Sequence, residues 1–138
     1  MKPLRILSIA TLFPDAARPN FGLFVEKSLL ALAAQPGVML TIVAPVGIPP
    51  FPLSLHPRYR ALRRLPQREA WRGLTVHRPR FTLIPKFGAA RNPAAIARAV
   101  LPIARQGSFD VVDAQFFYPD GPAAMRIANA LGLPFSIK

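Results

Sequence analysis

The sequence contains no cysteine, which excludes a disulfide framework and thiolate metal sites. Its two histidines, His56 and His77, have no second His or Cys at metal-ligand spacing, so we expect both to be structural or solvated, with no metal and no cofactor. No apolar run approaches the roughly 20 residues that cross a bilayer. We therefore expect a cytoplasmic protein. Any contact with a membrane would be peripheral, at the inner face of the cytoplasmic membrane.

Acidic residues are scarce, with 6 Asp and Glu against 18 Lys and Arg, a net charge of +12. Such a chain is attracted to polyanions, among them anionic lipid headgroups, nucleic acid and phosphorylated small molecules. Between residues 58 and 72 six arginines meet only Glu69, and Trp71 among them favours an interfacial role. A membrane or polyanion contact and a solvated loop explain this segment equally well. Its arginines are Arg58, Arg60, Arg63, Arg64, Arg68 and Arg72.

Several catalytic motifs are missing. The only glutamates are Glu26 and Glu69, and no Gly-x-Ser-x-Gly elbow occurs, so paired-carboxylate hydrolysis and serine chemistry lack candidates. The three-glycine dinucleotide fingerprint and the phosphate loop ending in Gly-Lys-Ser or Gly-Lys-Thr are also absent. We predict no self-sufficient catalytic site in this chain.

Short apolar runs alternate with helical patterns along the chain. Strands are predicted over residues 4–10, 38–44, 74–78, 109–114 and 135–137. Helices are predicted after Asn20, as N-cap, up to Pro36; from Asn92 to a stop or kink at Pro102; and over residues 120–131. Residues 45–73 form a Pro- and Arg-rich excursion with one short basic helix. This alternation predicts a Rossmann-like, doubly wound α/β domain with a mainly parallel sheet and helices on both faces.

Two loops follow predicted strands at the edge where doubly wound sheets bind ligands. The loop after Ala10 delivers Gly22 to a helix start, where free N–H groups favour a phosphate or sugar hydroxyl; Gly22 equally well permits only a tight entry. In the loop after Ala114, Tyr118 offers a hydroxyl and Asp120 is expected to cap a helix. Phe116 and Phe117 of the same loop are expected to be packing residues.

A set of segments carries a family resemblance by its order and spacing. The segments are Phe13-Pro14, PNFGLFV at 19–25, VMLTIVAP at 38–45, FDVVDA at 109–114 and YPDGPAA at 118–124. Over nearly all of residues 1–138 the chain thus resembles the amino-terminal domain of family 4 retaining glycosyltransferases. Those enzymes have the GT-B fold, in which two Rossmann-like domains face each other across a cleft.

The resemblance implies transfer of a sugar from a nucleoside-diphosphate sugar to a glycan or lipid-linked acceptor, without a required metal. Gln115 stands where many relatives have histidine. The glutamates that bind the donor belong to a carboxy-terminal domain, which this chain lacks, so we expect the chain to continue naturally and to be inactive alone. The resemblance implies that seven residues line the cleft that binds the acceptor and the donor phosphate. They are Asn20, Phe21, Gly22, Gln115, Tyr118, Asp120 and Gly121.

Two other interpretations stay open. The net charge and arginine cluster are also typical of a nucleic-acid-binding module, which is disfavoured because the aromatic residues lie mainly in apolar runs, without a recognition-helix or stacking-strand motif. The second is a noncatalytic α/β binding or scaffold domain, in which the two loops serve only as connections.

Overall fold

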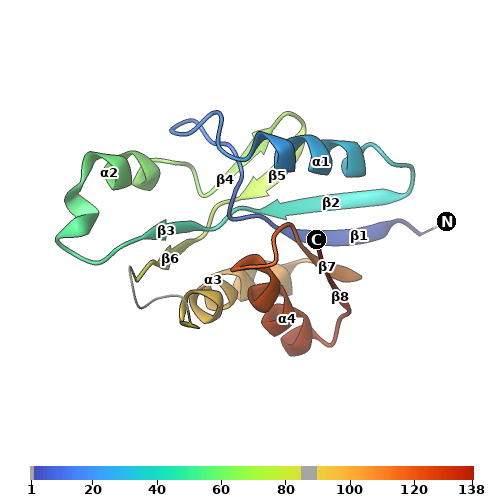
Figure 1. Ribbon diagram of the computed structural model, residues 1–138. Coiled ribbons are helices and arrows are strands. Elements are labelled where there is room, and N and C mark those ends of the chain that lie inside the picture. The colour runs from blue at the N-terminus through green and yellow to red at the C-terminus, as the bar shows by residue number, and fades with distance from the viewer. Residues whose placement is uncertain (1, 85–89) are drawn as a thin grey trace.

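The protein folds around a six-stranded sheet in the order β4-β5-β2-β1-β7-β8 (Figure 1), in a computed structural model that describes residues 2–84 and 90–138. Five strands are parallel and β4, at one edge, is antiparallel to β5. The prediction of a doubly wound, mainly parallel α/β fold is confirmed. The strands are β1 Leu4–Ile9, β2 Val38–Val43, β4 Arg68–Trp71, β5 Leu74–His77, β7 Val111–Ala114 and β8 Phe135–Ile137.

Helices cover both faces of this sheet, as Figure 1 shows. Helix α1 (Leu23–Ala33) lies on one face, and α3 (Asn92–Gln106) and α4 (Asp120–Leu131) lie on the other. Leu7 and Ile9 of β1 join the core beneath α3 and α4, whereas Ala10, directly after β1, joins the core beneath α1. A strand buried on both faces has to be apolar at successive positions, which explains the nearly continuous apolar runs. No helix in the described part of the chain is both long and apolar enough to span a bilayer.

Residues 45–73 are more ordered than the sequence indicated. The predicted basic helix is confirmed as α2 (Pro57–Arg63), preceded by a 3₁₀ turn, η1 (Leu53–Leu55). Strand β3 (Val46–Ile48) pairs in parallel with β6 (Arg80–Thr82) in a separate two-stranded sheet. Strands β3, β4 and β6 were not predicted, because runs of three or four residues without clear apolar alternation carry too little signal.

Some predicted helix boundaries are wrong. Helix α1 has Gly22 as its N-cap with no side-chain cap, so Asn20 does not cap it. Pro102 does not end α3, which continues to Gln106. On α1, Phe24 is 64% exposed, whereas Glu26 is buried. Pro102 is exposed on α3, where its ring occupies the solvent side of the helix.

Trp71 is half-buried and packs against the core beneath α1. Its Nε1 donates a hydrogen bond of 2.7 Å to Glu26 Oε2, and its ring lies edge-on to Phe13 with centroids 6.4 Å apart. The neighbouring Arg72 forms an ion pair of 3.6 Å with the same glutamate. These contacts fix the β4–β5 hairpin against α1 and give Trp71 a structural role there.

Arg78 is the largest fully buried side chain among the described residues. Its Nε donates to Glu69 Oε2 at 2.7 Å, and its terminal nitrogen donates to the Pro14 carbonyl at 3.1 Å. The guanidinium also lies over the rings of Phe13 and Trp71. This cation therefore joins the loop after β1 to the strand β4 at the sheet edge.

We expect Arg78→Ala to lower the free energy of unfolding by roughly 3 kcal/mol, because it opens a void and strands a buried carbonyl. Arg60→Ala, at an exposed arginine of α2, is the control and should change it by less than about 0.5 kcal/mol. Urea unfolding followed by circular dichroism measures both variants. If Arg78→Ala and Arg60→Ala lowered the free energy of unfolding by the same amount, the buried guanidinium would have no special structural role.

Candidate functional site

The candidate site lies where the direction of strand order reverses, between β1 and β7. From β1 the sheet extends through β2 and β5 on one side and through β7 and β8 on the other. Residues 10–22 and 115–119 leave the carboxyl ends of these two neighbouring strands. Ligands of doubly wound sheets bind outside the carboxyl ends at such a reversal, so the two loops frame the expected crevice.

The first loop is closed by its own residues. Asp15, fully buried, accepts hydrogen bonds from the Arg18 backbone N at 2.7 Å and from Arg18 Nη2 at 2.8 Å. The Arg18 guanidinium lies 4.2 Å from the centroid of the Phe21 ring, and Phe21 N donates to the Arg18 carbonyl. Because Asp15 and the Phe21 ring hold the Arg18 side chain, it is pre-organised and can offer its remaining donor group to a ligand at little entropic cost.

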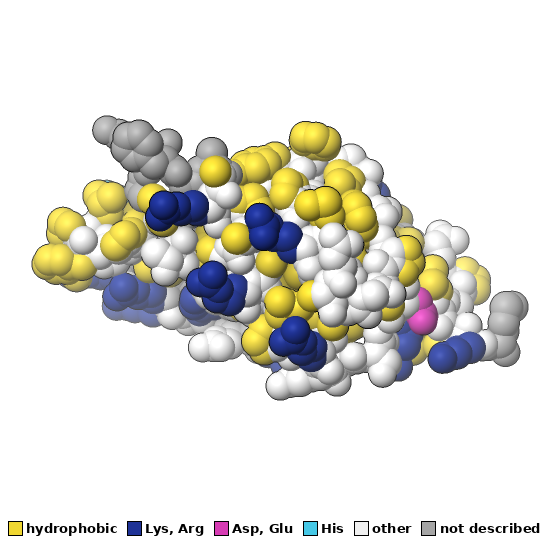
Figure 2. All heavy atoms as spheres, turned by 90° about the horizontal axis from the view of Figure 1, so that it is seen from below, with side chains coloured by type: hydrophobic (Ala, Val, Ile, Leu, Met, Phe, Trp, Pro, Cys, Tyr) yellow, Lys and Arg dark blue, Asp and Glu magenta, His cyan; other side chains and the backbone are white. Residues whose placement is uncertain are grey.

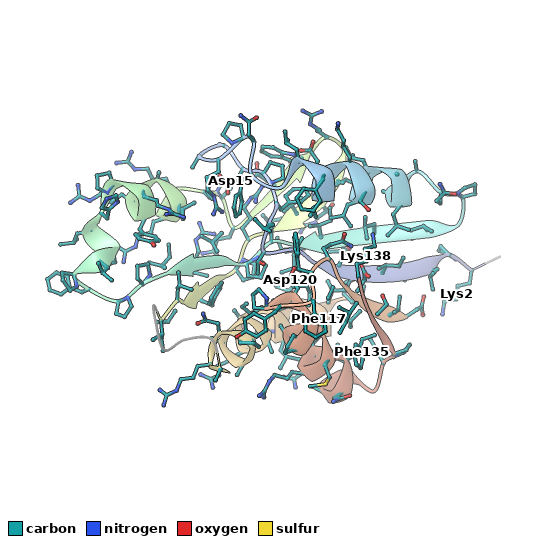
Figure 3. All side chains as sticks on the ribbon, in the orientation of Figure 1. Lys2, Asp15, Phe117, Asp120, Phe135 and Lys138 are labelled. Atoms are coloured by element: carbon teal, nitrogen blue, oxygen red, sulfur yellow. The ribbon has the colours of Figure 1, made fainter. Side chains whose placement is uncertain are left out.

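Asp120 joins the first loop to the start of α4. Its carboxylate accepts a 2.7 Å hydrogen bond from Thr11 Oγ1 and longer ones from Thr11 N at 3.3 and 3.4 Å. The predicted helix-cap role is wrong, because Pro119 is the N-cap of α4 and the Asp120 side chain turns to Thr11 instead. Figure 3 shows Asp120 at the base of α4, and Asp15 on the first loop.

The surroundings of Asp120 change its acidity. Burial raises its pKa to about 6, an effect that the hydrogen bonds from Thr11 oppose and the charge of Asp113 reinforces. The carboxyl therefore titrates close to neutral pH. Since Asp120 is fully buried, it acts on the crevice through Thr11 and is a positioning residue.

A pocket of about 240 Å³ opens between these loops, the β3–β6 sheet and α2. Its wall combines three aromatic side chains, from the loop, α2 and β6, with arginine, amide and hydroxyl groups. Ligand sites commonly have such walls, apolar in most places with a few converging polar groups. The lining residues are Thr11, Leu12, Arg18, Phe21, Pro45, Gly47, Arg58, Tyr59, Leu62, Phe81, Leu83, Asn92 and Pro119.

Of the seven residues predicted for the cleft, Phe21 lines this pocket directly. Gly22 lies beside it with φ +75°, and a Cβ there would stand 2.7 Å from the Leu12 carbonyl carbon and oxygen. Asn20 is exposed and does not line the pocket, and Tyr118 is 46% exposed. Gly121 is buried against Ile137 of β8, where a Cβ would be 3.1 Å from its Cδ1.

Gln115 lies on the α1 face of the sheet, in a buried polar network. Its Nε2 donates to Asp113 Oδ2 and, at 3.1 Å, to Ser8 Oγ. Asp113 also accepts hydrogen bonds from Ser8 at 2.9 Å and Ser136 at 2.8 Å, while Lys138 Nζ donates to Gln115 Oε1 at 3.4 Å. The structure therefore separates Gln115 from the pocket and assigns it to the junction of β1, β7 and β8.

The two phenylalanines of the second loop differ. Phe116 is half-buried and packs edge-on against Phe24 with ring centroids 5.6 Å apart, as expected of a packing residue. Phe117 is 76% exposed, so its predicted packing role is wrong. Figure 3 shows Phe117 beside α4.

Sequence reasoning missed several pocket residues, namely Thr11, Arg18, Tyr59 and Asn92. Thr11 and Arg18 lie in a loop that was already singled out, so the spacing of Asp15 and Arg18 was a usable signal. Tyr59 and Asn92 reach the pocket only through the unpredicted β3–β6 pairing. His56 was expected to be structural, and its Nδ1 caps α2 by accepting a hydrogen bond from Arg58 N.

A second hollow, of about 330 Å³, lies at the opposite end of the sheet beside Arg5, Met39 and Thr75. It adjoins the amino ends of β1, β2 and β5, where doubly wound sheets do not bind their ligands. We therefore assign the candidate site to the smaller pocket at the carboxyl ends. Among the described residues no cluster of three or more His, Cys, Asp or Glu side chains could hold a metal ion.

No protein-family model matches the chain, and no curated protein sequence is significantly similar to it. The geometry of the crevice and its side chains are therefore the guide to the function of this chain.

The close approach at Gly22 can be tested by a matched pair of substitutions. Gly22→Ala adds a clash with the Leu12 carbonyl to the cost of a left-handed backbone, and should destabilise the fold by roughly 3 kcal/mol or more. Gly37→Ala, at φ +76° with open space around it, should cost only about 1 kcal/mol. Thermal unfolding compares them; equal costs would show that the contact with Leu12 is unimportant.

Asp120 predicts a pH-dependent stability. Below about pH 4 the Asp120 carboxyl is protonated in both the folded and the unfolded chain. As the pH rises above about 4, the carboxyl ionises in the unfolded chain before it does so in the folded chain, and this favours unfolding. Between about pH 4 and pH 6 this contribution should lower the free energy of unfolding by roughly 3 kcal/mol, and remain constant above that range. Asp120→Asn should remove the slope.

Urea unfolding at several pH values measures this slope in the wild type and in Asp120→Asn. Asp110→Asn serves as the control, since it removes a different half-buried carboxyl, which accepts a hydrogen bond from Arg5 N. An unchanged slope in Asp120→Asn would contradict the raised pKa of Asp120.

Proposed function

We propose that the chain is the acceptor-side domain of a retaining glycosyltransferase that moves a sugar from a nucleoside-diphosphate sugar to a glycan or lipid-linked acceptor. The pocket at the carboxyl ends of β1 and β7 is the observation that carries this proposal. Phe21 and Tyr59 supply flat apolar surfaces, and Thr11, Arg18 and Asn92 supply hydrogen-bonding groups around them. A sugar needs both, because its ring has apolar C–H faces and a rim of hydroxyls.

The size of the pocket favours the acceptor side of such a reaction. At about 240 Å³ it is smaller than the roughly 300–1,000 Å³ of typical sites for larger ligands. It suits the terminal sugar of an acceptor better than a complete nucleoside-diphosphate sugar. We therefore propose that groups outside this chain, in a carboxy-terminal domain, bind most of the donor.

The charges around the pocket fit retaining chemistry without a protein nucleophile. No acidic residue lines the described wall, whereas Arg18 and Arg58 do. Cationic groups of this kind stabilise the negative charge that develops on a leaving diphosphate. In this proposal Asp120 orients Thr11, and Arg18 contacts a phosphate or a sugar hydroxyl.

Steady-state transfer assays test the proposal with the natural gene product, a panel of nucleotide sugars and water-soluble, short-chain acceptors. Phe21→Ala and Asn92→Ala should each raise the KM for the acceptor about tenfold and leave the KM for the donor within about twofold. Asn129→Ala, at an exposed position of α4, is the matched control and should behave as wild type.

Two results would count against the proposal. Absence of transfer with every donor and acceptor would favour a noncatalytic α/β binding domain. Pocket variants that change only the KM for the donor would assign this pocket to the nucleotide sugar instead of the acceptor.

A further inference from the structure

Large apolar side chains are concentrated on the surface around η1. Phe51 is 76% exposed, Leu53 is 54% exposed and Leu55 is 47% exposed. Single exposed apolar residues are ordinary, but three within five residues are typical of a surface that contacts another apolar phase. Figure 2 shows hydrophobic side chains at the end of the molecule that carries η1 and α2 in Figure 1. We call residues 51–55 the apolar loop.

Helix α2 follows the apolar loop directly and is basic on its outer side. Leu62, and Leu65 just after the helix, pack inward against Val46 of β3. Helix α2 and its C-cap residue carry four exposed arginines, none of which forms an ion pair with any described residue. They are Arg58, Arg60, Arg63 and Arg64, and Figure 2 shows basic side chains next to the hydrophobic ones at this end.

No exposed acidic side chain offsets these arginines. All six acidic residues lie within the described ranges, and each is buried or half-buried with a hydrogen-bonding partner inside the fold. An approaching anionic surface therefore meets attraction and no local repulsion at α2. Arg68 and Arg72, the other members of the predicted basic segment, lie on β4 and in the β4–β5 turn, apart from this group.

We propose that this end of the protein docks on an anionic lipid bilayer, with the apolar loop inserted at the boundary of headgroups and acyl chains and the α2 arginines on lipid phosphates. Insertion of apolar side chains beside cations is how interfacial helices and loops bind such surfaces. Lipid is favoured over nucleic acid because Leu53 and Leu55 cannot stack on bases as aromatic side chains do. The assignment stands independently of the glycosyltransferase proposal.

Docking in this orientation has a consequence for the pocket. Arg58, Tyr59 and Leu62 of α2 also line it, so the pocket would open close to the membrane surface. A lipid-linked acceptor could then present its headgroup to the pocket while its chain stays in the bilayer.

Vesicle sedimentation tests the docking with the 138-residue chain and vesicles of about 30% phosphatidylglycerol in phosphatidylcholine, or of phosphatidylcholine alone. Binding should require the anionic lipid and weaken between about 0.1 M and about 0.5 M salt. Phe51→Ser/Leu53→Ser/Leu55→Ser, and separately Arg58→Gln/Arg60→Gln/Arg63→Gln/Arg64→Gln, should each weaken binding at least about tenfold. All substituted side chains are exposed, and circular dichroism checks that the variants remain folded.

The control removes the same number of charges from α3, its N-cap residue and α4, with Arg91→Gln/Arg98→Gln/Arg105→Gln/Arg126→Gln, and should weaken binding less than about threefold. Phe51→Trp should add tryptophan emission that shifts to the blue on anionic vesicles. Equal losses in the control, no blue shift, or tighter binding to duplex DNA than to vesicles at the same salt would each overturn the proposal; the last would favour a nucleic-acid partner.

Discussion

The structure depends on a small set of carboxylates, all used inside the fold. Asp120 holds the loop after β1 to α4, Asp110 accepts a hydrogen bond from β1, and Glu26 holds the β4–β5 hairpin to α1. Glu69 pairs with the buried Arg78, and Asp15 closes the first loop. Each of these carboxylates is buried or half-buried. The hydrogen bonds of these carboxylates fix the loops of the crevice. Because the acidic groups are used in this way, the exposed charged side chains are basic.

Helix α2 connects the pocket with the proposed membrane contact, because its residues contribute to both. Helix α2 contributes Arg58 and Tyr59 to the pocket, and its other arginines face outward. Its position is set by the packing of Leu62 and Leu65 on Val46 of β3. The short β3–β6 sheet therefore builds one wall of the pocket and supports the basic helix at the same time.

The sheet could be predicted from the sequence because five of its strands are short apolar runs separated by helical patterns. The loops after Ala10 and Ala114 could be singled out for the same reason, since strand order places them at one edge of the sheet. The β3–β6 pairing could not, because two three-residue strands depend on tertiary contacts. Tyr59 and Asn92 were missed with it. The contact of Asp120 with Thr11 was also missed, since an Asp before a helix predicts a cap equally well from local sequence.

Carbodiimide coupling of an amine to carboxyl groups, followed by mass spectrometry, tests most directly whether the six carboxylates are internal. In the native chain the six side chains should react at least about tenfold more slowly than in urea, because each is buried or half-buried and hydrogen-bonded. In urea all six should become modified. Rapid modification of Asp15, Asp120 or Glu26 in the native chain would contradict the account, since those groups would then face solvent.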